Sequence, residues 1–126
     1  MNKQYKRVST KGLANKYNFK VYPAPFGIWF RSCIQGAIRR GLDFTFTLRQ
    51  GYELSQGDCY YCGQKGVSVI DGFRYNGIDR IDNSDGYHFK NVVTCCKVCN
   101  SMKSKMSIAD FLSHVSTIAE QLIKEG

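Results

Sequence analysis

The sequence predicts a small α+β domain, and three observations lead to this fold class. Two Cys-x-x-Cys pairs, Cys59/Cys62 and Cys96/Cys99, enclose the middle of the chain. Two short runs rich in β-branched residues lie between the pairs, and stretches with helical periodicity lie on both sides of them. We therefore expect strand, loop, strand and helix inside a cysteine clamp, with flanking helices.

The composition is that of a globular chain, with 43% hydrophobic and 22% charged residues over a length of 126. No apolar run reaches the length of a membrane span. The basic N-terminal segment is not followed by the apolar stretch of a secretory signal. We therefore expect an intracellular protein with no membrane partner.

The cysteines favour zinc over disulfides. Six cysteines could form three disulfides, as in small secreted domains. The paired spacing and the lack of a secretory signal favour one tetrahedral zinc held by four thiolates. The two cysteines outside the pairs, Cys33 and Cys95, are then expected to be packed thiols.

Positive charge is concentrated in the first half of the chain. Residues 1–50 contain ten Lys or Arg and one acidic residue, whereas residues 51–126 contain eight and nine. This asymmetry favours a polyanion as the partner of the first half, and basic chains bind the phosphates of DNA; a solubilising basic segment is the alternative. We divide the chain into a basic, aromatic-containing arm over 1–25, which either contacts nucleic acid or packs on the protein, and one domain over 26–126.

Residues 26–40 are expected to form a helix, because apolar residues recur there at helical spacing. Three arginines lie off the apolar stripe, so we expect Arg31, Arg39 and Arg40 to face a nucleic-acid backbone.

Two shorter elements are expected next. Residues 44–47 alternate Phe with Thr, which predicts a strand. A short helix is predicted over 48–54, with Thr47 as its cap, although Gly51 disfavours it.

The core is expected over 57–106. Within it, residues 75–81 and 91–95 are predicted to be strands, and a helix is predicted over 99–106. A final helix over 107–124 carries one apolar stripe. We expect that stripe to pack against the domain; a dimer interface is the alternative.

Three segments, 59–63, 76–87 and 91–103, together resemble HNH endonucleases with a ββα-metal (His-Me finger) active site. The similarity covers about residues 57–112 and is greatest to the zinc-bound HNH nucleases of phages, large DNA viruses and some restriction enzymes. The resemblance implies a homing, phage/viral or restriction-type endonuclease that hydrolyses phosphodiester bonds in double-stranded DNA. Such an enzyme would act in the cytoplasm of a bacterial or infected host cell. It could act as a homodimer.

The resemblance also implies roles for particular residues. A structural zinc would be held by Cys59, Cys62, Cys96 and Cys99. A catalytic Mg²⁺ or Mn²⁺ would be held by Asp79 and Asn100, whose oxygen atoms suit a hard cation. Asn91 would hold the loop between the strands. Lys103 and Lys105, which closely follow Asn100, are expected to contact phosphates.

One position departs from the family pattern. Where family members usually have a general-base His directly after the metal Asp, this chain has Arg80, which cannot be deprotonated. Arg80 can instead bind a phosphate oxygen or stabilise developing charge. The candidates for the base are Tyr61 assisted by Arg80, then His88, then a metal-bound water alone; Tyr61 as a packing residue is an equal alternative.

Two other functions stay open. A zinc-stapled DNA-binding module that has lost catalysis would account for Arg80, although such a module would not need Asp79 and Asn100. An RNA-directed nuclease is a weaker alternative, because phosphate contacts alone do not distinguish RNA from DNA.

Overall fold

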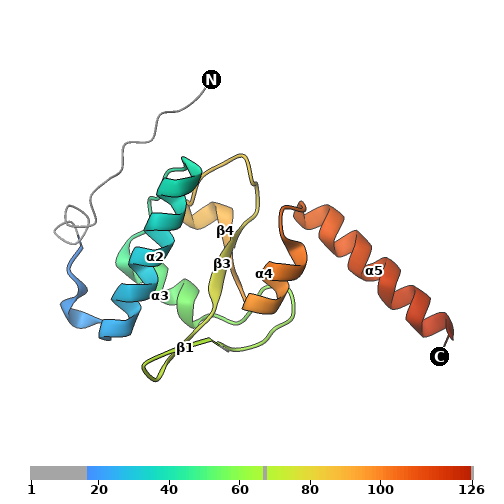
Figure 1. Ribbon diagram of the computed structural model, residues 1–126, viewed down its shortest axis with the longest axis horizontal. Helices are drawn as coiled ribbons and strands as arrows, with labels where there is room; N and C mark the ends of the chain where they lie inside the picture. Colours follow the sequence, from blue (N-terminus) through green and yellow to red (C-terminus); the bar gives the residue numbers. More distant parts are fainter. Residues whose placement is uncertain (1–16, 67, 126) are drawn as a thin grey trace.

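The computed structural model describes residues 17–66 and 68–125. Most of the predicted basic arm lies outside these residues. In chain order, the elements of the described part are η1 (Phe19–Val21), α2 (Ala24–Arg40), α3 (Leu48–Gln56), β1 (Ser68–Ile70), β2 (Phe73–Tyr75), β3 (Gly77–Arg80), η2 (Phe89–Asn91), β4 (Val92–Cys95), α4 (Lys97–Lys103) and α5 (Ile108–Glu125) (Figure 1).

Helix α2 confirms the first predicted helix and supplies much of the core. It starts two residues earlier than predicted and ends at Gly41, which adopts the left-handed conformation with φ 75°. Its buried face carries Phe26, Trp29 and Phe30, which pack with other aromatic rings from η1, α3 and the segment after α2. An aromatic core therefore fills the first half of the molecule.

Helix α3 confirms the second predicted helix, and its glycine has a packing reason. Thr47 and Gln50 form a reciprocal capping box at its start. A Cβ on Gly51 would lie only 2.6 Å from the Phe30 ring. Glycine lowers intrinsic helix propensity here, but it allows α3 to approach α2 closely.

The strand predicted over 44–47 is wrong. Within the described residues, the segment pairs through a single parallel bridge between Phe44 and Tyr87, in which the Thr45 N–H donates to Tyr87 O and the Tyr87 N–H donates to Asp43 O. The Phe residues do alternate inward, with Phe46 buried and Thr45 exposed. The neighbour of this extended segment is a loop, so no ladder forms.

Two antiparallel hairpins follow. Strands β1 and β2 are joined by Asp71 and Gly72, both with positive φ, as a two-residue hairpin turn requires. Strands β3 and β4 pair with Asp79 opposite Val93. The single strand predicted over 75–81 is therefore divided at Asn76, whose buried amide donates to the carbonyls of Gly57 and Gln64.

The second predicted strand is confirmed as β4, except that Asn91 belongs to η2. Helix α4 covers β3, but it starts two residues earlier and ends three residues earlier than predicted. It begins after its N-cap Cys96 and ends before Ser104, which has a positive φ of 50°. Strands β3 and β4 with α4 thus form a ββα unit.

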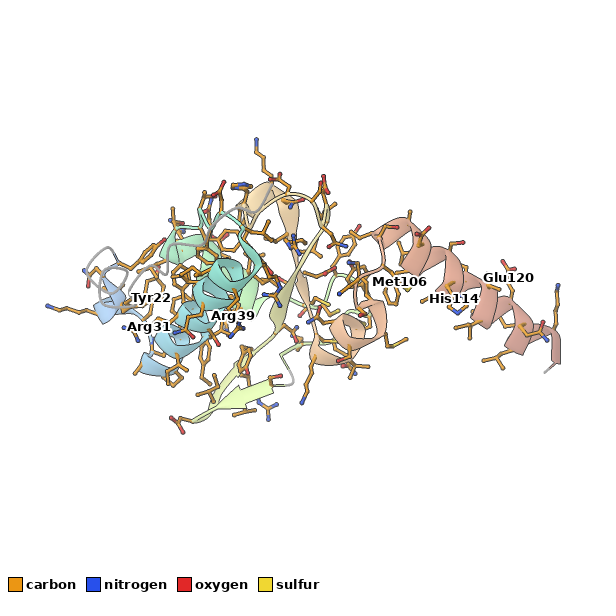
Figure 2. The ribbon with its side chains drawn as sticks, turned by 45° about the horizontal axis from the view of Figure 1, so that its top comes forward. Tyr22, Arg31, Arg39, Met106, His114 and Glu120 are labelled. Carbon is orange, nitrogen blue, oxygen red and sulfur yellow. The ribbon has the colours of Figure 1, made fainter. Side chains whose placement is uncertain are left out.

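Helix α5 confirms the last predicted helix, but the predicted packing of its stripe is wrong. Phe111 is buried against Tyr61, and beyond it the helix extends away from the other elements (Figure 1). The stripe residues Leu112, Val115, Ile118 and Leu122 are 38–64% exposed. His114 also lies on this projecting helix, far from Arg31 and Arg39 on α2 (Figure 2). Among the described residues, no helix is both long enough and apolar enough to span a membrane.

Candidate functional site

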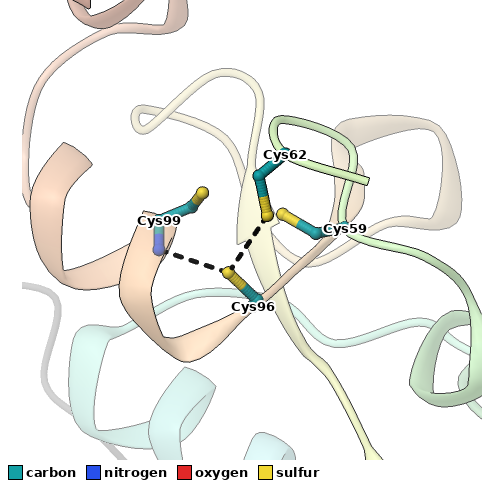
Figure 3. Close-up of side chains that lie close together, drawn as sticks. All are labelled: Cys59, Cys62, Cys96 and Cys99. Carbon is teal, nitrogen blue, oxygen red and sulfur yellow. Dashed lines mark hydrogen bonds between the residues drawn. The ribbon is translucent and has the colours of Figure 1, made fainter. Parts of the chain in front are cut away.

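Four cysteine sulfurs converge between the turn after α3 and the start of α4 (Figure 3). The sulfurs of Cys59, Cys62, Cys96 and Cys99 all lie within 4.8 Å of one another, and Cys62 Sγ is 3.7 Å from Cys96 Sγ. Zinc–sulfur bonds of about 2.3 Å in a tetrahedron place sulfurs about 3.8 Å apart. The donor set therefore fits zinc, and no disulfide joins these cysteines.

Backbone amides favour the thiolate form within this cluster. Burial raises the pKa of Cys59, but hydrogen bonds from the backbone of Cys96, Cys62 and Tyr61 outweigh it and lower the pKa to about 6. The Cys99 N–H also donates to Cys96 Sγ at 3.4 Å. Because zinc binds thiolates, these amides prepare the cluster for the metal.

The two remaining cysteines are in different surroundings. Cys95 is buried beside the cluster, and burial raises its thiol pKa to about 12. Burial likewise raises the pKa of Cys33 to about 12. Both thiols are packed, as predicted, and their raised pKa favours the protonated form at neutral pH.

Asp79, near the end of β3, is almost buried and has both carboxylate oxygens engaged. The Tyr61 hydroxyl donates to Oδ2 at 2.6 Å. Lys103 Nζ lies 3.2 Å from Oδ1 and 3.1 Å from Oδ2. Asp79 therefore already has a cationic partner and a neutral donor.

The Tyr61 side chain is fixed by its neighbours. Its ring packs edge-on against Phe111, and its position inside the first cysteine pair ties it to the cluster. Burial raises its pKa most, and the hydrogen bond to Asp79 and the charge of that carboxylate raise it further. In this arrangement the Tyr61 hydroxyl is a hydrogen-bond donor to Asp79.

The predicted phosphate contact of Lys103 is wrong, because its side chain is completely buried. Residues three and four apart share one face of a helix, so the positions of Cys99 and Lys103 in α4 place both on its inner face. This periodicity was the signal in the sequence that could have identified Lys103 as a partner of the core.

An open cleft of about 670 Å³ lies beside Asp79. Its lining residues are Arg40, Leu42, Ile78, Asp79, Arg80, Asn83, Tyr87, Asn100, Ser104 and Lys105. A carboxylate and an amide oxygen, from Asp79 and Asn100, thus border one cleft together with three cationic side chains. Such oxygen donors suit a hard divalent ion, so the residues present fit Mg²⁺ or Mn²⁺.

The predicted cationic residues of α2 occupy different environments. Arg40 borders this cleft, and Arg39 lines an adjoining cavity of about 320 Å³ that also reaches Asn100. The Arg31 guanidinium instead lies 4.5 Å above the Phe19 ring. Only Arg39 and Arg40 are therefore close to the candidate site.

Arg80 is anchored to the loop that follows β3. Its Nη1 donates to the carbonyls of Asn83 at 2.6 Å and Asp85 at 3.0 Å, and its guanidinium lies 5.2 Å from the Tyr87 ring centroid. From the sequence we expected Arg80 to be the cation that assists Tyr61. In the structure, Asp79 accepts the hydrogen bond from Tyr61, and the cation that contacts Asp79 is Lys103.

Asn91 and His88 also contact this loop. The buried Asn91 side chain donates to the carbonyls of Asp82 and Gly86, and its Oδ1 accepts from the Asp82 N–H. His88 Nδ1 is 2.8 Å from Thr45 Oγ1 and Nε2 is 3.5 Å from Asp85 Oδ1. His88 does not line the cleft, so its predicted catalytic role has no geometric support.

Small antiparallel sheets, helices and a four-cysteine cluster give the chain the α+β fold of an HNH nuclease. A solved structure with this fold is that of the rare-cutting HNH restriction endonuclease PacI, which matches with a TM-score of 0.57 at 23% sequence identity. The match covers 80% of this chain and 81% of that one. The fold implied by the sequence resemblance is therefore confirmed.

Sequence comparison adds a viral relative. An uncharacterized protein of Acanthamoeba polyphaga mimivirus is 42% identical over 83 residues, which are 66% of this chain. The match spans only 15% of that relative's length. No protein-family model matches the chain.

Proposed function

We propose that this chain is an HNH-type endonuclease that hydrolyses phosphodiester bonds in double-stranded DNA with a divalent metal. The observation that carries this proposal is the cleft where Asp79 and Asn100 lie beside Arg40, Arg80 and Lys105. Oxygen donors for a hard cation next to side chains that attract phosphate are what metal-assisted phosphodiester hydrolysis needs. A homing, viral or restriction role is equally compatible with this chemistry.

Four residues of the cleft and the neighbouring Asn91 have defined parts in this proposal. When bound, Mg²⁺ or Mn²⁺ would act as a Lewis acid toward the scissile phosphate and the leaving oxygen. Asp79 and Asn100 would hold the ion from β3 and α4, and Arg40 and Lys105 would bind DNA phosphates. Asn91 keeps the loop after β3 in place through its hydrogen bonds to Asp82 and Gly86.

The general base in this proposal is Tyr61, which directly contacts a proposed metal ligand. In the described arrangement its pKa is raised, first by burial and then by Asp79. Added positive charge beside Asp79 would oppose the two causes that involve this carboxylate, whereas burial, the largest cause, would remain. Tyr61→Phe should therefore lower the cleavage rate and change its pH profile; an unchanged rate and profile would remove Tyr61 from the mechanism.

Cleavage of supercoiled plasmid by zinc-loaded protein tests the proposal. We expect nicking or linearisation with Mg²⁺ or Mn²⁺, loss of both with EDTA, and loss in Asp79→Asn. Asparagine is a better replacement than alanine at this position, because its side-chain oxygen can still accept a hydrogen bond from buried Lys103, which preserves the fold. Duplex DNA and RNA competitors distinguish the preferred nucleic acid.

A second function is an inactive, zinc-stapled DNA-binding module. Two observations favour it: Arg80 is bound to loop carbonyls, and Asp79 is already paired with Lys103. This alternative predicts a folded, zinc-loaded protein that shifts DNA in a gel. With any divalent metal, it would cleave neither plasmid DNA nor a library of random-sequence DNA. Library substrates are needed because a rare target site could be missing from one plasmid.

Homodimer formation is part of the nuclease proposal. The exposed apolar residues of α5 would lose contact with water in a dimer. Sedimentation of wild-type protein against Leu122→Ser tests this, and a wild-type monomer at every concentration used for cleavage would reject it.

A further inference from the structure

We propose that Lys103 is a built-in cation of the candidate metal site and limits how tightly Asp79 can hold a divalent ion. This inference rests on the proposed function, because it requires the ion to bind Asp79. It assigns Lys103 a positioning role that differs from the phosphate contact expected from its place in the sequence.

The geometry of the ion pair carries the inference. Lys103 has no exposed surface, and its ammonium lies 3.1 and 3.2 Å from the two oxygens of Asp79. Tyr61 donates a further hydrogen bond to Oδ2. Each Asp79 oxygen therefore already accepts from a donor, and an ion that binds either oxygen must share it.

Helix α4 places the two proposed interactions on different sides of Asp79. Cys99, Asn100 and Lys103 all belong to this seven-residue helix. Asn100 is exposed and borders the cleft, whereas Lys103 is buried and does not line it. Asp79 would thus meet the divalent ion from the cleft and the lysine from the interior.

Electrostatics gives the direction of the effect. An ammonium and a divalent ion on the same carboxylate repel each other, and limited access of water to the buried lysine weakens screening. The ammonium also holds the carboxylate in place when no ion is bound, because a nearly buried carboxylate needs a partner. Lys103 therefore weakens metal binding while it keeps the ligand ordered.

The test is a titration of zinc-loaded protein with Mn²⁺. Calorimetry and the electron paramagnetic resonance signal of free Mn²⁺ measure the binding affinity. Lys103→Met removes the charge but retains an unbranched apolar side chain, and it should bind Mn²⁺ roughly tenfold more tightly or better. Lys105→Met is the matched control, because Lys105 is an exposed lysine at the same cleft. It should change the affinity by no more than about twofold.

Asp79→Asn separates failure of this inference from failure of the proposed function. If wild-type protein binds Mn²⁺ through Asp79 but Lys103→Met binds equally or less tightly, the inference fails and the metal site stands. If no Mn²⁺ binding depends on Asp79, the proposed metal site fails and the inference fails with it.

A measurement on the wild-type protein covers the case in which Lys103→Met does not fold. The ¹⁵N resonance of the Lys103 ammonium should shift on addition of Mg²⁺ and saturate with the affinity of the Asp79 site. The Lys105 resonance should show no such saturation. A Lys103 resonance that does not respond while Mg²⁺ fills the Asp79 site overturns the inference.

Discussion

The region built on α2 and α3 and the region enclosed by the two cysteine pairs are held together by different forces. In the first, Phe26, Trp29 and Phe30 are at most 5% exposed and belong to one continuous aromatic core. In the second, strands of four residues and a helix of seven surround a small cluster of cysteines and Tyr61. The comparison indicates that apolar burial stabilises the first region, while the second depends on metal ligation.

The largest expected effect is loss of the metal from the cysteine region. Cys96→Ser should release zinc and unfold β3, β4 and α4, because a structural zinc contributes about 10–16 kcal/mol in small domains. Zinc content and amide hydrogen exchange measure this, with fast exchange expected in α4 and slower exchange in α2. Cys95→Ala is the matched control and should retain zinc; a folded Cys96→Ser protein without zinc would contradict the assignment.

The second effect breaks the aromatic region instead. Phe30→Ala should lower the free energy of unfolding by about 3–5 kcal/mol, because it leaves a cavity between α2 and α3. Urea unfolding of the zinc-loaded protein measures the change, and zinc content should stay at the wild-type value. Phe89, which is 41% exposed, provides the control Phe89→Ala with little expected loss. Equal losses from both variants would show that the aromatic core is not what stabilises this region.

A smaller effect tests the connection between the regions. Thr94 on β4 donates a hydrogen bond from Oγ1 to the Leu54 carbonyl of α3 at 2.7 Å. Thr94→Val should cost about 1–2 kcal/mol, because it leaves a buried carbonyl without that donor. Fluorescence of Trp29, the only tryptophan, reports the aromatic region, and zinc release reports the other. The two unfolding transitions should lie further apart than in wild type; an unchanged separation would argue against this connection.

The smallest effect is expected from an ion pair on the surface of α3. Arg49 and Glu53 form a pair at 3.5 Å, but their side chains are 86% and 56% exposed. Arg49→Ala should change the free energy of unfolding by less than about 0.5 kcal/mol, because water and salt screen such pairs. Urea unfolding at low and high salt checks this. A loss comparable to that of Phe30→Ala would mean that surface charge stabilises α3.

Local sequence patterns predicted much of the fold. Some features depend only on neighbours within a few residues: the helical stripe over 26–40, the cap at Thr47 and the two cysteine pairs. The structure confirms these helices and the cysteine cluster. Residues 44–47 alternate as a strand does, but a strand also needs a partner. Their partner, at Tyr87, lies in a loop that no local pattern identifies.

The same limit applies to tertiary contacts. The stripe of α5 has helical periodicity, but periodicity does not say what covers it, and here most of it is exposed. At the candidate site, the sequence identified Asp79 and Tyr61 separately, and their hydrogen bond depends on folding across the insert between the cysteine pairs. Lys103 follows Cys99 by four residues in both the predicted and the observed helix, so its burial depends on which face of α4 packs against β3 and not on where the helix starts.

The shortness of α4 has a practical consequence for any chelation experiment. A helix of seven residues is not stable in isolation, so Asn100 and Lys103 would keep their positions only while a metal ligates Cys96 and Cys99. By mass action, the fraction of protein with an ordered cleft would then follow the free zinc concentration of its surroundings. In the proposed nuclease, EDTA would abolish cleavage by removing either ion, and recovery with Mg²⁺ alone would show that the lost ion was the one proposed for the cleft.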